Sequence, residues 1–233
     1  MISFIVPAHN EEALLGTTLA ALHDAGRAVG DLYEIVVADD ASTDSTAAIA
    51  AEQGARVVSH DRRQISASRN VGARAAAGEW FFFVDADTLV NTAVVRAAMQ
   101  ALHKGAVGGG CVFRFDGKLP AYAVLMQWFT TPLYRLFGVA GGCFLFCTRE
   151  AYLTAGGFDE ELFAAEELAF GQRLKRQGRW VILRERVITS GRKLRAHSAW
   201  EILQVIARVV IRGPQSFRRR EGLEIWYGPR SNP

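Results

Sequence analysis

The chain has 233 residues, of which 50% are hydrophobic and 22% are charged, and its net charge is +3. This length suffices for one α/β domain with a sizeable core, and no repeat, low-complexity tract or linker divides the sequence. The lack of a known nucleic-acid-binding motif argues against a nucleic acid partner, and no apolar run reaches the roughly 18 residues expected of a membrane-spanning helix.

The first predicted strand, residues 2–6, is an apolar run that leads directly into Pro7, His9 and Glu11. Four leucines at helical spacing then predict a helix: Leu14, Leu15, Leu19 and Leu22. Because Met1 precedes the strand without a basic region or a cleavage site, we expect no signal peptide.

The second predicted strand, residues 33–38, ends in Asp39 and Asp40. The Ser, Thr and Asp residues that follow are typical helix N-caps and predict a helix over residues 46–53. One of the two carboxylates is expected to cap that helix. A third strand, residues 56–59, leads to segment 66–72, which contains Arg69, and to an Ala-rich helix.

The fourth predicted strand, residues 80–84, is a continuous apolar run that ends in Asp85 and Asp87. Such a run is typical of a strand buried on both faces. The repeated strand-helix alternation predicts a parallel, helix-covered sheet, whose ligands bind at the carboxyl ends of the strands. Two carboxylates separated by one residue suit Mg²⁺ or Mn²⁺ and a diphosphate that shares the ion. Alternatively, they form an acidic turn that caps the strand.

The second half is less periodic. Residues 107–115 predict a strand whose three consecutive glycines indicate a bulge or a close backbone approach. Residues 119–136 are rich in aromatic and aliphatic side chains, and we expect them to belong to the core and to a substrate site for the acceptor molecule rather than to lie at a membrane interface. Gly141 and Gly142 form a turn or a binding segment before a buried strand. The three cysteines lack zinc-site spacing, so we expect buried, reduced thiols in a cytoplasmic protein: Cys111, Cys143 and Cys147.

Four segments resemble, in order and spacing, the family 2 glycosyltransferases: residues 7–12, 37–44, 68–72 and 84–87. The resemblance implies the GT-A fold, an α/β fold with a mostly parallel central sheet and helices on both faces, in one domain over residues 1–233. We expect residues 1–90 to bind a nucleotide sugar, residues 91–197 to form the acceptor and catalytic half, and residues 198–233 to form a basic helix and tail.

The resemblance further implies a metal-dependent, inverting transfer of a sugar from a nucleotide sugar donor to an acceptor hydroxyl or phosphate. The acceptor is a saccharide, a lipid-linked molecule or a small molecule. Mn²⁺ or Mg²⁺ is expected at Asp87 and Asp85, with His197 either as a third ligand or as an ordinary hydrogen-bonded residue. The substrate-binding residues implied are Pro7, His9, Glu11, Asp39, Asp40, Arg69, Asp85, Gly141, Gly142 and Arg192.

An inverting transfer also needs a general base that takes the acceptor's proton. Glu167 falls where the family carries its catalytic aspartate, after a Gly-Gly-Phe-Asp turn at residues 156–159. Glutamate is one methylene longer than aspartate but keeps the carboxylate. Glu166 is the alternative base, or else it orients the loop or binds an acceptor hydroxyl. Two carboxylates at a helix start also suit the helix dipole, which is a purely structural alternative.

The charge is unevenly distributed. Residues 1–172 contain 12 Lys and Arg against 20 Asp and Glu, whereas residues 173–233 contain 15 against 4. Ser198 and Glu201 have the capping-box spacing and predict a helix over residues 199–211, beyond which lie Arg218, Arg219 and Arg220. This basic tail suits either contact with the inner face of an anionic membrane or simple packing on the domain.

Two other functions stay open. A nucleotidyltransferase shares a related sheet and a metal-binding aspartate but needs a Gly-rich basic loop after its first strand, where this chain carries residues 7–11. The same missing loop argues against a nicotinamide dehydrogenase. A degenerate nucleotide-sugar-binding protein is expected to lose Asp85, Asp87 or the distal carboxylate, and all are present.

Overall fold

The computed structural model describes residues 1–196, 198, 200–201, 217–218 and 220. His197, Arg219 and most of the predicted helix over residues 199–211 therefore lie outside the described residues. No helix in the described part of the chain is long and apolar enough to cross a membrane.

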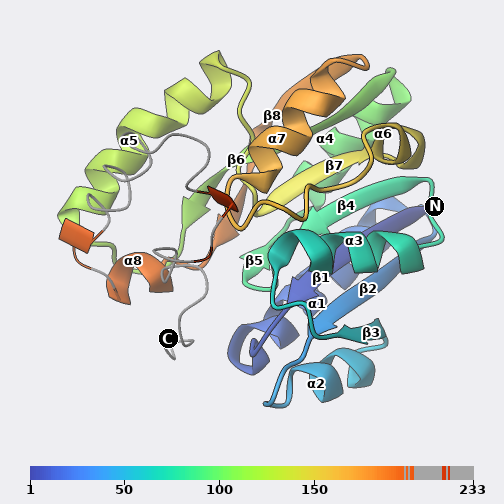
Figure 1. The fold of residues 1–233 in the computed structure, drawn as a ribbon. Coiled ribbons are helices and arrows are strands. Elements are labelled where there is room, and N and C mark those ends of the chain that lie inside the picture. Colours follow the sequence, from blue (N-terminus) through green and yellow to red (C-terminus); the bar gives the residue numbers. More distant parts are fainter. Residues whose placement is uncertain (197, 199, 202–216, 219, 221–233) are drawn as a thin grey trace.

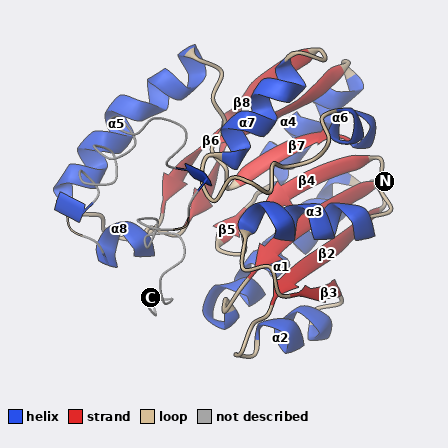
Figure 2. Ribbon diagram, viewed as in Figure 1, coloured by secondary structure: helices blue, strands red, loops and turns tan. Residues whose placement is uncertain are grey.

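Eight strands in the described residues form one sheet, in the order β3-β2-β1-β4-β7-β6-β8-β5 (Figures 1 and 2). Six of them run in one direction, and β7 and β5 run antiparallel to their neighbours, so the sheet is mostly parallel, as predicted. The strands are β1 (Ile2–Ala8), β2 (Tyr33–Asp40), β3 (Arg56–His60), β4 (Trp80–Val84), β5 (Thr88–Leu89), β6 (Ala106–Phe115), β7 (Phe144–Thr148) and β8 (Arg179–Thr189).

Helices cover both faces of this sheet, which confirms the predicted layering. One face carries α1 (Glu12–Val29), α2 (Thr46–Glu52) and α4 (Thr92–His103), and the other carries α3 (Ile65–Ala75), α6 (Arg149–Thr154) and α7 (Glu166–Lys175). Two further helices, α5 (Ala121–Leu136) and α8 (Arg192–Ala196), stand to one side of the sheet (Figure 1).

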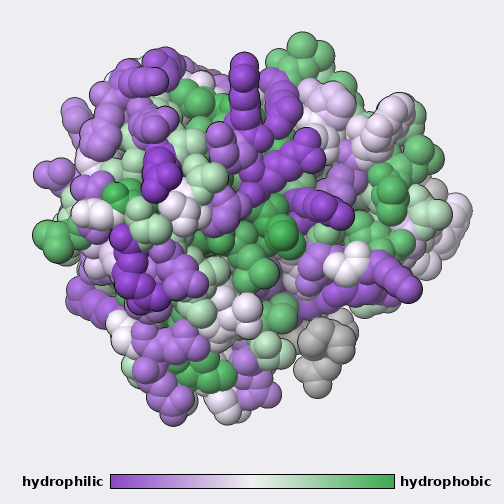
Figure 3. All heavy atoms as spheres, turned by 180° about the vertical axis from the view of Figure 1, so that it is seen from behind, coloured by the Kyte–Doolittle hydropathy of each residue, from purple (hydrophilic) through white to green (hydrophobic). Residues whose placement is uncertain are grey.

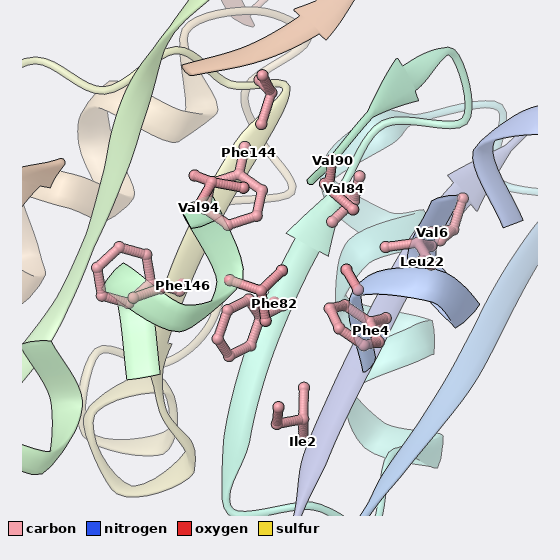
Figure 4. Close-up of a cluster of buried hydrophobic side chains, with 14 of the residues drawn as sticks. Ile2, Phe4, Val6, Leu22, Phe82, Val84, Val90, Val94, Phe144 and Phe146 are labelled. Atoms are coloured by element: carbon pink, nitrogen blue, oxygen red, sulfur yellow. The ribbon is translucent and has the colours of Figure 1, made fainter. Parts of the chain in front are cut away.

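Alternation of side chains along the strands builds a separate core on each face. Phe4 and Phe82 point to the α1 and α4 side, where their ring centroids lie 5.5 Å apart (Figure 4). Phe81 and Phe83 point to the opposite side, against α3, α6 and α7. The apolar run of β4 is thus buried on both faces, as its sequence predicts.

The glycines of β6 allow the close approach that the sequence indicates. A Cβ on Gly109 would lie 2.1 Å from the carbonyl oxygen of Val181 on β8. The pairing of β6 with β8 also shifts register between Ala106 and Gly108, and again between Cys111 and Val112. All three cysteines are buried and free of disulfides, which confirms their predicted burial as thiols.

The structure differs from the sequence-based predictions in three respects. The strands β1 and β2 continue beyond their apolar runs, because parallel pairing persists as far as Ala8 and Asp39. Segment 68–72 lies inside α3 rather than before it. The core interpretation of residues 119–136 is wrong for most of that segment, since within α5 only Ala123 is buried.

Candidate active site

The carboxyl ends of β1, β2 and β4 meet at one edge of the sheet, because the three strands are parallel neighbours. Pro7 is buried within β1, opposite Ala38 of β2. The loops that follow β1 and β2 are tied together: the Asn10 side chain accepts the N–H of Thr43, and Thr46 Oγ1 accepts the N–H of Glu11. Asn10 itself has a φ of 51°. Its left-handed backbone, which Asn tolerates better than most residues, turns the chain sharply at this edge.

Asp39 brings a buried carboxylate to this edge. Its side chain is 5% exposed, and its Oδ1 atom has no hydrogen-bond partner among the described residues. A buried acceptor without a donor is costly for a protein to keep. The position therefore suits a ligand that donates a hydrogen bond, as an N–H or hydroxyl group does.

Asp40, the neighbouring carboxylate, is satisfied within the protein. It accepts the backbone N–H groups of Arg63 and Gln64 at 2.7 and 2.8 Å and the hydroxyl of Ser68 at 3.1 Å. These donors lie at the start of α3, so Asp40 caps α3 and not α2, the next helix along the chain. Its geometry is that of a positioning residue.

His9 lies beside this cap. Its Nδ1 atom is 2.8 Å from the Asp40 carbonyl oxygen, and its Nε2 atom is 2.5 Å from the Arg63 guanidinium. These two partners require a proton on Nδ1 and an acceptor lone pair on Nε2. His9 thereby connects the loop after β1 to the start of α3.

Arg69 is the central buried cation of the second half of the site. Its side chain is 1% exposed and donates to Glu166 at 2.7 Å, to Asp85 at 3.0 Å and to the Gly142 carbonyl oxygen at 2.9 Å. Burial alone would lower the pKa of Arg69, but Asp85 and Glu166 raise it above its usual range. Arg69 is therefore the buried ion-pair partner of two protein carboxylates, and it fixes β4, α3, α7 and the Gly142 turn relative to one another.

Arg192 makes the corresponding connection on the other side of the edge. It donates to both oxygens of Glu11 at 2.6 Å and to Asp87 at 3.3 Å, and it is 6% exposed. The backbone of Ser190 also donates to the Asp87 carbonyl oxygen. The end of β8 is thus held against the loops that follow β1 and β4.

Asp85 and Asp87 fit a divalent cation by the chemistry of their oxygens. Burial and the neighbouring Asp85 raise the pKa of Asp87 to about 6, although Lys193 opposes this effect. A cation placed between the two carboxylates would relieve that repulsion. In the described part of the chain, no set of three or more His, Cys, Asp or Glu side chains is arranged to hold a metal ion, and His197 lies outside it. Within the described residues, Asp85 and Asp87 are therefore the carboxylates that would hold such a cation.

Glu166 and Glu167 are the first two residues of α7, and their carboxylates differ sharply. Glu166 is 4% exposed and held by Arg69, whereas Glu167 is more exposed and forms no ion pair with another described residue. Burial, and next the charge of Glu166, raise the pKa of Glu167 to about 7. Ala165, which precedes both, has a φ of 59°, a strained backbone for a residue with a Cβ. Glu167 has the properties of a general base poised near neutral pH.

Gly141 and Gly142 form the turn that makes room for this carboxylate. A Cβ on Gly142 would lie 3.3 Å from the Glu167 carboxyl carbon, and one on Gly141 would lie 2.3 Å from the Phe113 ring. A side chain on Gly141 would therefore collide with Phe113, and one on Gly142 would crowd the carboxylate of Glu167.

Three further residues lie near these groups and were not among the candidate site residues named from the sequence. Asn70 bonds to both the backbone N–H and the carbonyl oxygen of Phe158, and so ties α3 to the Gly-Gly-Phe-Asp turn. Burial, and then Glu167, raise the pKa of Tyr134 on α5. Lys193 acts on Asp87 through its charge. The adjacency of Asn70 to Arg69 and of Lys193 to Arg192 is the only sequence signal for these roles.

The glycosyl transferase family 2 model matches residues 3–148. A validoxylamine A glucosyltransferase from Streptomyces hygroscopicus subsp. jinggangensis is 31% identical over 130 residues, which is 52% of this chain and 30% of that protein. The succinoglycan biosynthesis protein ExoO from Rhizobium meliloti is 32% identical over 103 residues, covering 42% of this chain and 29% of that protein. The chain thus spans less than a third of the length of these relatives.

Two solved structures share the fold. The mannosyltransferase PcManGT from Pyrobaculum calidifontis, in complex with GDP-Man and Mn²⁺, matches with a TM-score of 0.68 at 21% identity, over 93% of this chain and 66% of that chain. Glucosyl-3-phosphoglycerate synthase from Mycobacterium tuberculosis, in complex with Mn²⁺, UDP and glucosyl-3-phosphoglycerate, matches with a TM-score of 0.61 at 20% identity, over 99% of this chain and 81% of that chain.

Proposed function

The chain belongs to glycosyl transferase family 2 and has the GT-A fold, and from that premise we propose that it transfers a sugar from a nucleotide sugar to an acceptor, with inversion at the transferred carbon. One observation carries the proposal. Arg69 joins Asp85, at the end of β4, to Glu166, which directly precedes the candidate base Glu167. A donor-side carboxylate and a base are thereby held in one rigid arrangement.

The donor lies along the edge formed by β1, β2 and β4. The unpartnered Oδ1 atom of Asp39 accepts a hydrogen bond from the nucleobase or the ribose. Asp85, whose side chain is 28% exposed, faces the ribose or the sugar. Pro7, His9 and Glu11 shape the nearby wall, and Asp40 holds the loop through its bonds at the start of α3.

A divalent cation, Mn²⁺ or Mg²⁺, would be held by Asp87 and Asp85 and would neutralise charge on the donor diphosphate. Both solved structures described above contain Mn²⁺, which supports this choice. Arg192 and Lys193 lie on the same side and add positive charge near Asp87. Such cations stabilise the charge that the nucleoside diphosphate gains as it leaves.

Glu167 accepts the proton of the acceptor hydroxyl as that oxygen attacks the sugar carbon. The bond between sugar and diphosphate breaks on the opposite side, which inverts the configuration. A pKa of about 7 suits this role, because the carboxylate is then both available and basic near neutral pH. Glu166 stays paired with Arg69 and positions the base.

A panel of UDP and GDP sugars, tested with Mn²⁺ by thermal shift and by slow hydrolysis, tests this proposal. We expect at least one donor to stabilise the protein and to be cleaved to the nucleoside diphosphate. Stabilisation without any cleavage would favour a degenerate binding protein. Release of pyrophosphate from a nucleoside triphosphate and a sugar phosphate would favour a nucleotidyltransferase.

A further inference from the structure

Helix α5 turns an apolar face to solvent, contrary to the usual pattern of a surface helix. Its large exposed side chains have between 46% and 75% of their surface accessible: Val124, Leu125, Trp128, Phe129, Leu133 and Leu136. At 100° per residue, these positions cover about half of the helix circumference. Apolar side chains gather along the edge of the molecule that this helix occupies (Figure 3). Contiguous exposed apolar surface of this kind marks an interaction site.

Hydrogen bonds tie α5 to the catalytic half, and its inner face, opposite the exposed apolar side chains, carries Gln127 and Tyr134. The Gln127 side chain donates to the Phe113 carbonyl oxygen at 3.1 Å, and the Tyr122 hydroxyl donates to the Leu194 carbonyl oxygen at 2.8 Å. Tyr134 on this inner face packs near Phe113, with ring centroids 6.1 Å apart, and lies within electrostatic range of Glu167. The apolar outer face is therefore held in a fixed position relative to the candidate base.

The charged residues around α5 indicate what kind of partner its apolar face binds. The helix contains no acidic residue, and Arg135 near its end donates to the Arg184 carbonyl oxygen at 3.1 Å. Lys175 donates to the Phe137 carbonyl oxygen just beyond the helix, at 3.2 Å. At the other end lie Lys118, three residues before the helix, and Arg195, which is paired with Asp116. Basic groups therefore lie at both ends of the apolar face, accompanied by Asp116 and Glu201 near its start and by no acidic residue within the helix.

We propose that the outer face of α5 docks on the surface of an anionic lipid bilayer. An apolar stripe with aromatic side chains and basic flanks is the pattern of a helix that lies in the interfacial plane, where the cations meet lipid phosphates. A contact between two copies through α5 would instead bring basic ends together, which is unfavourable. At 16 residues, about 24 Å long, the helix is suited to lie on a bilayer and too short to span one.

If the proposed transferase function holds, docking has a consequence for the substrate. Tyr134 and Glu167 would then lie just inside the bilayer-facing helix, so the acceptor would be one presented at a membrane surface. Vesicle binding itself does not require catalysis, so the docking proposal and the enzyme proposal can fail independently.

Co-sedimentation of the full chain with vesicles tests the docking directly. The vesicles contain phosphatidylcholine alone or mixed with phosphatidylglycerol, at low and high salt. The full chain should pellet with the anionic vesicles and less so at high salt. The double variant Trp128→Ser, Phe129→Ser should partition at least about tenfold less, since both large side chains leave the interface. The variant Arg135→Glu, Arg184→Glu should lose the preference for anionic lipid.

A matched control is Leu32→Ser, Leu153→Ser, which removes two side chains that are 79% and 65% exposed but lie outside α5. This control should pellet as the wild type does, and all variants should keep the wild-type melting temperature. Failure of the full chain to bind anionic vesicles would overturn the proposal, as would equal binding by the Trp128→Ser, Phe129→Ser variant. A wild-type dimer that this variant dissociates, without vesicle binding, would assign the face to a second copy instead.

Discussion

Replacing Glu167 with glutamine should separate chemistry from binding. Glutamine is nearly isosteric with glutamate but cannot accept a proton, and a general base is worth roughly 10²–10⁴ in rate, or about 2.7–5.5 kcal/mol of barrier. We therefore expect Glu167→Gln to lower turnover by that factor. Donor affinity should barely change, because the donor-side carboxylates Asp39, Asp85 and Asp87 are untouched.

The pH dependence of kcat/KM gives a second quantitative test. Burial and the charge of Glu166 raise the pKa of Glu167 to about 7. Only the deprotonated form is a base, so activity rises with pH: roughly a tenth of the carboxylate is available at pH 6 and about nine tenths at pH 8. Wild-type kcat/KM should thus increase about tenfold over this interval, and Glu167→Gln should abolish that increase.

Glu166→Gln is the matched control, because it changes the neighbouring carboxylate and is expected to lower the stability of the fold. It removes the buried charge partner of Arg69, and breaking such a pair costs about 3–5 kcal/mol. For a chain of this size the melting temperature should fall by roughly 6–20 °C. The assay compares steady-state kinetics across pH with thermal melts of the free proteins. A larger loss of turnover in Glu166→Gln than in Glu167→Gln, without a loss of stability, would refute the assignment of the base.

Three further substitutions test other parts of the structure. Asp39→Ala should leave the melting temperature of the free protein unchanged or higher, since Oδ1 of Asp39 is unpartnered, while it removes the stabilisation that a nucleotide sugar provides in a thermal-shift assay. Arg69→Met should lower the melting temperature strongly, because two carboxylates lose their buried partner. An unchanged free energy of unfolding in chemical denaturation would contradict this expectation. Gly109→Ala should cost about 1–3 kcal/mol or more of unfolding free energy, since its Cβ would lie 2.1 Å from the Val181 carbonyl oxygen, and a wild-type unfolding midpoint would contradict this packing.

The local sequence pattern predicts much of the sheet and of the sheet edge that carries the candidate active site. The run over residues 80–84 is apolar on both faces of β4, so its burial and the position of Asp85 and Asp87 at the end of the strand could be predicted directly. The helix after β1 follows from leucine spacing, and Leu15, Leu19 and Leu22 are all buried. Side chains return to the same face every two residues in a strand and every 3.6 residues in a helix, so a short segment already contains the whole pattern.

Long-range pairings could not be predicted in the same way. Arg69 and Glu166 are 97 positions apart, and Arg192 and Glu11 are 181 apart, so nothing local marks them as partners. The resemblance implied a substrate-binding role for Arg69, and the structure buries it between two protein carboxylates, which nothing in the local sequence indicates. The error at α5 has another cause: a segment rich in aromatic and aliphatic residues suits either burial in the core or contact with a partner, and composition does not distinguish the two.

The most direct test of inverting transfer is the configuration of the sugar that the protein releases. In an NMR time course with the donor identified from the panel, we expect the first sugar released to have the anomeric configuration opposite to that in the donor, before mutarotation. Release should require Mn²⁺ or Mg²⁺, and it should be lost in Asp87→Ala and greatly slowed in Glu167→Gln. Initial release with retained configuration, or undiminished release by the Asp87→Ala variant, would contradict the account.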